Sequence, residues 1–211
     1  VAMPTATAIQ PTTFSAAFPV ASTNGANSPV ITWEEFEREY LSREDDFKYE
    51  WVNGRVVKTK RTMNKTQLYI LDNLFAFFHH LLNEGKVTGW LVPEPDLFFL
   101  TNHRRPDIAW MTREQMHKLA DLKAYEVPAF IIEVVSTNDQ VNELKDKMKN
   151  YRDAGVQVVW QIHPKQQEVD VYAGKNLTKS KVCTGRQICS AAPVLPAFAL
   201  PASAIFHKLT V

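Results

Sequence analysis

The chain has 211 residues, of which 45% are apolar and 22% are charged, and its formal net charge is +1. This composition excludes a wholly disordered protein, and no apolar stretch approaches the ~20 residues that a membrane-spanning helix needs. The near-zero charge excludes a molecule that is basic overall, so any nucleic-acid-binding surface has to be local.

The beginning of the chain differs in composition from the rest. Segment 1–29 is rich in Ala, Thr, Ser and Pro, and it lacks the basic start and the apolar stretch of a secretory signal. We therefore expect a flexible tail followed by one domain over 30–211. Cys183 and Cys189 match no CxxC redox motif or zinc-ribbon spacing. Two reduced, partly buried thiols fit a cytoplasmic protein.

Local signals define three elements in the first half of the chain. Thr32 and Glu35 have the spacing of a capping box at a helix start. Asn53 and Gly54 suit a type I′ turn between two strands. Apolar residues at three- and four-residue steps predict a long helix that ends before Gly85. The predicted elements are a helix over 33–42, a hairpin of 47–52 and 55–60, and a helix over 65–83.

The second half alternates strand and helix patterns. We predict strands over 90–100, 107–111, 129–135, 156–163 and 168–172, and a helix over 140–154 that ends at Gly155. The polar loop 101–106 joins the first two strands. The strand 129–135 is almost wholly apolar, which predicts a place in the middle of a sheet. For the Pro- and Ala-rich segment 191–206 we expect an irregular chain packed on the domain.

The most informative single residue is Glu133, which interrupts the apolar strand 129–135. Burying an unpaired carboxylate costs several kcal/mol, about the stability of a small domain, so a partner is required. That partner could be a basic side chain, a hydrogen-bond cluster, a bound metal or a proton. A structural salt bridge and an edge-facing side chain are the alternatives without a function.

Asp107 adds a second acid at the start of a neighbouring predicted strand. It follows Pro106 and precedes the apolar strand residues 108–110. Taken alone it would be a strand-end or turn residue, but two acids on adjacent strands could share one cation. Carboxylate oxygens suit hard ions such as Mg²⁺ or Mn²⁺, which keep several waters and need few protein ligands.

At these residues the sequence resembles the Uma-two branch of the PD-(D/E)XK restriction-endonuclease-like superfamily. The resemblance rests on the order and spacing of short motifs from Ile31 to Phe206. These are ITWEEF (31–36), YEWVNG (49–54), PDI (106–108), IEVVS (132–136), KMKNY (147–151), AGV (154–156), WQI (160–162), LPAF (195–198) and IF (205–206). The resemblance implies an α/β (α+β) fold, with a mixed central sheet flanked by helices and an N-terminal hairpin.

The resemblance also implies site residues. Asp107 matches the aspartate of the PD pair and Glu133 the acid of the (D/E)XK triplet, so both would bind Mg²⁺ or Mn²⁺. Val135 stands where the triplet lysine is expected, and Lys147 on the following helix matches the lysine that replaces it in this branch. An ammonium there would help to activate water or stabilise charge on phosphorus. An exposed helix lysine is the alternative.

Further charged residues have two interpretations each. Glu50 is similar to the family's upstream glutamate, which would hold a second metal or orient a water, and its alternative is a cross-strand ion pair. Two basic groups could grip phosphates or could simply be solvated charge. They are Lys58, Lys60, Arg61 and Lys65 after the hairpin, and Arg104 and Arg105 before Asp107.

The resulting hypothesis is a Mg²⁺-dependent endonuclease that hydrolyses DNA phosphodiester bonds with water as nucleophile. By analogy, a homodimer would allow both strands to be cut. The rival is a non-catalytic module of the same fold that binds nucleic acid or a protein partner, because a fold does not determine a function.

Overall fold

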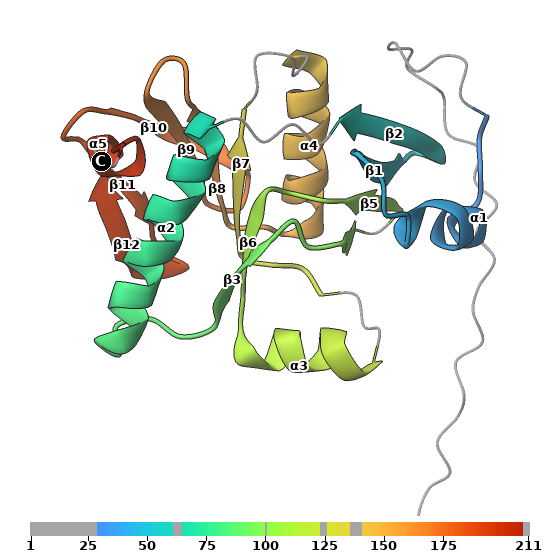
Figure 1. Cartoon of the computed structure of the whole chain (residues 1–211), viewed down its shortest axis with the longest axis horizontal. Coiled ribbons are helices and arrows are strands. Elements are labelled where there is room, and N and C mark those ends of the chain that lie inside the picture. Colours follow the sequence, from blue (N-terminus) through green and yellow to red (C-terminus); the bar gives the residue numbers. More distant parts are fainter. Residues whose placement is uncertain (1–28, 61–64, 100, 123–125, 136–140, 209–211) are drawn as a thin grey trace, which may run out of the picture.

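The computed structural model describes residues 29–60, 65–99, 101–122, 126–135 and 141–208 (Figure 1). Its largest sheet has six strands in the order β10-β9-β8-β7-β6-β3. These strands are β3 (Trp90–Pro93), β6 (Ile108–Met111), β7 (Phe130–Val134), β8 (Val158–His163), β9 (Glu168–Ala173) and β10 (Thr178–Thr184). β7 and β8 are parallel, and the other pairs are antiparallel. The mid-sheet place of β7 confirms the prediction from the apolar sequence of that strand. The mixed sheet with its helices confirms the predicted α/β class.

A second sheet of four strands lies beside the first, in the order β2-β1-β5-β4. Its strands are β1 (Phe47–Val52), β2 (Arg55–Lys60), β4 (Leu97–Phe99) and β5 (Asn102–Arg104). The predicted hairpin is confirmed, since Asn53 and Gly54 have φ of 51° and 76°. The prediction of one strand over 90–100 is wrong, because this segment contains two separate strands, β3 and β4. β5 lies where a loop was expected. At Glu94, with φ of 43°, the chain leaves the first sheet and enters the second.

The helices begin and end largely where the sequence signals place them. α1 (Trp33–Phe36) has the predicted capping box, with Thr32 and Glu35 joined by two hydrogen bonds of 2.8 and 3.2 Å, and it continues as a π-helical segment, Glu37–Leu41. α2 (Lys65–Asn83) and α4 (Val141–Ala154) match the predicted helices closely. In the described part of the chain, no helix is long and apolar enough to cross a membrane.

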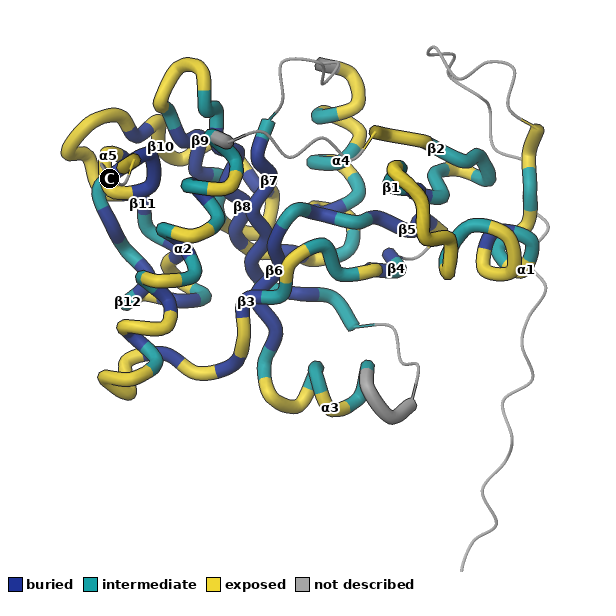
Figure 2. The backbone as a smooth tube through the Cα atoms, viewed as in Figure 1, coloured by how far each residue is buried: buried dark blue, intermediate teal, exposed yellow. Residues whose placement is uncertain are grey.

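The central strands β6, β7 and β8 are almost wholly buried (Figure 2). The two faces of the six-stranded sheet have separate cores. One face packs against α2 and β12 (Leu195–Pro201), around Phe198 and Trp160. The other packs against α4, around Tyr151 and Val159. Side chains alternate between these faces along each strand, so a residue's position in the strand decides which helix it meets.

Several elements were not predicted. α3 (Arg113–Leu122) follows β6, and β10 forms the edge of the large sheet. The segment expected to be irregular instead contains β12, paired with β11 (Ile188–Ala191), followed by α5 (Ala202–Ile205). Polar residues dominate β10, and β12 contains Pro196 and Pro201, so local pattern alone favoured loops in both places.

Candidate active site

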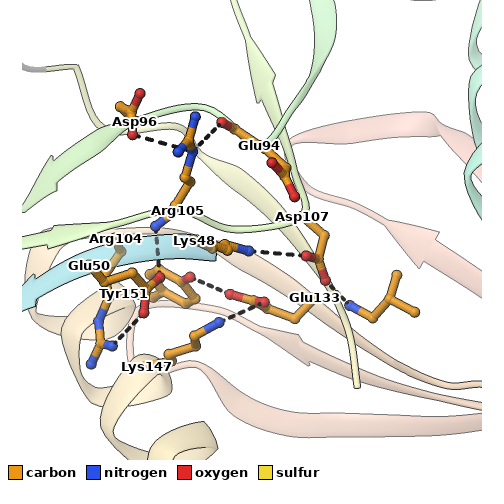
Figure 3. Close-up of polar contacts among 11 residues, drawn as sticks. Lys48, Glu50, Glu94, Asp96, Arg104, Arg105, Asp107, Glu133, Lys147 and Tyr151 are labelled. Atoms are coloured by element: carbon orange, nitrogen blue, oxygen red, sulfur yellow. Dashed lines mark hydrogen bonds and ion pairs between the residues drawn. The ribbon is translucent and has the colours of Figure 1, made fainter. Parts of the chain in front are cut away.

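Asp107 and Glu133 lie next to each other on the face of the sheet that α4 covers (Figure 3). β6 and β7 are antiparallel with Ile108 opposite Ile132, so the register puts Asp107, one residue before β6, opposite Glu133. Asp107 Oδ2 accepts a 2.7 Å hydrogen bond from the backbone N–H of Val134. The structure therefore brings together the two acids that the sequence singled out.

Glu133 is only 4% exposed and has a donor for each carboxylate oxygen. The Tyr151 hydroxyl donates to Oε1, and Lys147 Nζ lies 3.1 Å from Oε2. Burial raises the pKa of Glu133 above its usual range; the Lys147 ammonium opposes this rise, and the charge of Asp107 adds to it. The ionised carboxylate is costly to bury, and Lys147 and Tyr151 compensate part of that cost.

Lys147 is the residue of α4 whose ammonium faces the acids. It lies one turn before Tyr151 on α4, so both side chains point from one helix face toward the sheet. Burial alone would lower the pKa of Lys147, but the carboxylates of Glu133, Glu50 and Asp107 outweigh it and raise the pKa. Lys147 is therefore a charged member of the cluster, not an exposed helix lysine.

Glu50 forms a buried ion pair with Arg104, its cross-strand neighbour on β5. Arg104 Nη1 lies 3.0 Å from Glu50 Oε2, and the backbone N–H of Arg105 donates to Oε1 over 2.8 Å. Arg104 also donates from Nε to Asn150 Oδ1 on α4. Burial alone would raise the pKa of Glu50, but Lys147 and then Arg104 outweigh it and lower the pKa to about 2. Glu50 is thus an ionised partner of two basic groups.

Two members of the cluster, Lys48 and Tyr151, were not predicted from the sequence. Lys48 on β1 places Nζ 3.2 Å from Asp107 Oδ1, and Tyr151 donates to Glu133. Strand alternation could have found Lys48, because it shares a face of β1 with Glu50. Helical spacing could have found Tyr151, which is four residues after Lys147.

The basic residues proposed to grip phosphates have different surroundings. Arg61 and the side chain of Lys65 lie outside the described residues. Lys58 Nζ sits 3.6 Å from the centre of the Phe47 ring, and Lys60 is exposed. Arg105 reaches toward Asp96 and donates to the carbonyl of Glu94.

Arg104 requires a correction. At 3% exposure, and with its guanidinium bound to Glu50 and Asn150, it is an internal counter-ion. A phosphate approaching from solvent would have to displace both partners, so its position does not fit a role in gripping nucleic acid.

The donor set of the site suits a hard divalent cation only in part. Asp107 and Glu133 supply four carboxylate oxygens, and each accepts one contact, which leaves lone pairs for a metal ion. Among the described residues, no three His, Cys, Asp or Glu side chains are grouped to hold an ion. Two acids are nevertheless enough for an ion such as Mg²⁺, which retains waters and takes substrate oxygens.

The mixed sheet flanked by helices agrees with the restriction-endonuclease-like fold that the sequence resemblance implies. A solved structure from Anabaena variabilis ATCC 29413, described as a "putative nuclease belonging to DUF820", is similar with a TM-score of 0.68 and 17% identity. The similarity covers 83% of this chain and 97% of that one. The chain belongs to the Uma2 family, whose model, described as "Putative restriction endonuclease", matches residues 33–203. No curated protein matches the chain.

Proposed function

We propose that the protein is a divalent-metal-dependent endonuclease that hydrolyses DNA phosphodiester bonds. The observation that supports this most is the adjacency of Asp107 and Glu133 on one sheet face, with Lys147 charged beside them. Perturbed ionisable groups that gather at one end of a sheet are more typical of functional sites than of structural ion pairs. Membership of the Uma2 family agrees with a nuclease.

In this proposal Asp107 and Glu133 hold Mg²⁺ or Mn²⁺. When bound, such an ion would polarise the phosphoryl group and favour hydroxide formation near neutral pH. Water is the nucleophile: its oxygen bonds to phosphorus, one P–O bond to a deoxyribose breaks, and the departing oxygen takes up a proton. The carboxylates around Lys147 raise its pKa, which favours the protonated ammonium. It donates hydrogen bonds and stabilises the negative charge that develops on phosphorus.

Tyr151 and Glu50 act through these residues. Tyr151 and Lys147 hold the two Glu133 oxygens in place, so the carboxylate is oriented before an ion arrives. Glu50 raises the pKa of Lys147, and therefore helps to keep the ammonium charged. We assign Glu50 this electrostatic support because its carboxylate pairs with the buried Arg104, whereas Glu133 lies opposite Asp107 on the neighbouring strand.

Plasmid nicking with and without Mg²⁺ tests the proposal. We expect cutting by the wild type only with the metal, and a loss of at least about a hundredfold in Asp107→Asn, Glu133→Gln and Lys147→Met, the size typical of losing one electrostatic stabiliser. Lys149→Met is the matched control, because Lys149 lies on the same helix but is 63% exposed and pairs with Asp153. Unchanged cutting by Glu133→Gln, with folding retained, would contradict the proposal.

The cluster also favours a second candidate, a module that binds nucleic acid or a protein partner without cutting. Each of its three carboxylates already has a basic partner, so the site is electrically balanced without a metal. DNA binding that is unaffected by Mg²⁺, together with an absence of nicking, would support this second candidate.

For the nuclease we also propose a homodimer, which would present two sites to a DNA duplex. Light scattering of the purified protein would detect the dimer.

A further inference from the structure

One feature of the site, the ion pair between Lys48 and Asp107, has no part in the function proposed above. Lys48 belongs to β1 of the four-stranded sheet, whereas Asp107 directly precedes β6 of the six-stranded sheet, so the contact joins the two sheets across the site (Figure 3). Asp107 is the most open of the three acids, with a side chain 27% exposed against 5% for both Glu50 and Glu133. A cation arriving from solvent therefore meets Asp107 first, where the Lys48 ammonium already sits.

The charge balance of the cluster explains why the position of the Lys48 ammonium matters for metal binding. The three acids and three basic residues form one pair each: Lys48 with Asp107, Arg104 with Glu50, and Lys147 with Glu133. Adding a divalent cation to this largely buried set would leave two uncompensated positive charges. Such an excess is costly away from water, so an ammonium must withdraw or an anion must enter.

Of the three basic residues, Lys48 is the one that can withdraw at least cost. Arg104 is held by both Glu50 and Asn150 inside the protein. Lys147 also interacts with the buried Glu50 carboxylate, which would lose part of its charge compensation if Lys147 withdrew. If Lys48 withdraws, Asp107 keeps the backbone N–H of Val134 as a donor and remains partly solvated. The flexible four-carbon stem of a lysine also allows the ammonium to move.

We propose that Lys48 is a built-in counter-ion of Asp107 that a divalent cation displaces, and that the displaced ammonium then contacts the phosphate of the nucleic acid. This inference rests on the nuclease function proposed above and adds a phosphate-binding residue to it. The phosphate brings the negative charge that the metal-loaded cluster lacks. Metal and nucleic acid therefore bind cooperatively, with Lys48 exchanging one anionic partner for another.

Calorimetric titration of the full chain with Mn²⁺ tests the displacement step. Lys48→Met removes the competing charge and should bind Mn²⁺ about tenfold more tightly than the wild type, or better, in the absence of nucleic acid. Lys48→Arg keeps the positive charge and should stay close to wild type. Lys86→Met is the matched control, since Lys86 is an exposed lysine paired with Glu84 away from the site. Lys48→Gln replaces the Met variant if thermal unfolding shows that the latter is not folded.

Anisotropy of a fluorescent DNA duplex tests the phosphate contact. Ca²⁺ serves as the metal, because it takes the same kind of oxygen ligands. Without Ca²⁺, Lys48→Met should bind the duplex as the wild type does, because Lys48 is occupied by Asp107. With Ca²⁺, Lys48→Met should bind the duplex several-fold more weakly than the wild type does, because it lacks one contact to a phosphate. An equal loss with and without the metal would overturn the phosphate contact.

Further outcomes separate this inference from the proposed function. If the wild type binds Mn²⁺, Glu133→Gln abolishes that binding and Lys48→Met leaves the affinity unchanged or lowers it, only the role of Lys48 is overturned. If no variant binds Mn²⁺, the proposed function and the inference fail together. Binding by Lys48→Met but not by the wild type would support the inference most strongly.

Discussion

Individual residues of the site show opposite electrostatic effects on stability. The pKa of Glu133 is raised, mainly by burial, so the folded state holds that proton more tightly than the unfolded chain does. Its ionisation therefore costs stability as the pH rises through the folded-state pKa. Glu50 has a lowered pKa and contributes stability when ionised. The two buried acids therefore have opposite effects on stability at neutral pH.

Glu50 leads to a prediction about stability and pH. Its pKa falls from 4.5 in the unfolded chain to about 2 in the folded protein, which corresponds to about 3 kcal/mol of stability. This contribution is complete above about pH 5 and is lost as the pH falls toward 2. Glu50→Gln should therefore lower the free energy of unfolding by about 3 kcal/mol or more at pH 7, because Arg104 is left unpaired. The difference from wild type should shrink by pH 3.

Urea denaturation at pH 7, 5 and 3 measures this effect. Glu39→Gln is the control, since Glu39 pairs with Arg38 at the surface and should change stability by less than about 0.5 kcal/mol. A difference between wild type and Glu50→Gln that is the same at all three pH values would show that the ion pair is not the cause.

At the scale of elements, the entry into β3 depends on one glycine. Gly89 has φ of +81°, and a Cβ there would lie 2.3 Å from the backbone oxygen of Met111 on the paired strand β6. Gly85 also has a positive φ, +70°, but a Cβ there would meet nothing within 4 Å. Alanine substitutions at the two glycines therefore distinguish the cost of backbone strain from the cost of a steric clash.

We expect Gly85→Ala to lower the free energy of unfolding by about 1 kcal/mol, the cost of a left-handed conformation for a residue with a Cβ. Gly89→Ala should cost at least about 3 kcal/mol, because β3 must also move away from β6. Chemical denaturation of the two variants compares these costs directly. Equal losses would mean that the edge strand moves freely and that the clash is relieved without cost.

At the scale of the whole molecule, one face of the six-stranded sheet carries the larger apolar core and the other carries the candidate site. Phe198, fully buried, packs against Phe78, Phe130 and Trp160 on the α2 face. The acids and α4 occupy the opposite face. The site face can therefore hold buried charges, because the apolar face of the same strands stabilises the sheet.

Phe198→Ala tests this separation. We expect it to lower the free energy of unfolding by about 3–5 kcal/mol, through lost apolar burial and the cavity left behind. The affinity of the remaining folded protein for Mn²⁺ should stay within a few-fold of wild type, because the substitution is on the far face. Calorimetry well below the midpoint of thermal unfolding measures this affinity. A loss of metal binding in the folded variant would show that the two faces are coupled.

The sequence by itself determined the features that depend on neighbouring residues. The capping box at Thr32, the Asn53-Gly54 turn, the period of α2 and the burial of β7 are properties of a few adjacent side chains. Glu133 could be identified in the same way, because an acid inside an apolar strand is anomalous wherever that strand packs. Asp107 was recognisable as an acid at the start of an apolar strand, and the family motifs added Lys147, which no local pattern connects to the two acids.

Only the tertiary structure decided which partner each charge has. Lys48 reaches Asp107 across 59 positions of sequence, and Arg104 reaches Glu50 across 54. The edge strand β10 and the hairpin of β11 and β12 are likewise strands because a paired strand satisfies their backbone, which their own composition does not predict. Pairing between distant segments depends on register and on the approach of two sheets. These are set by the packing of the whole chain and cannot be inferred from a window of sequence.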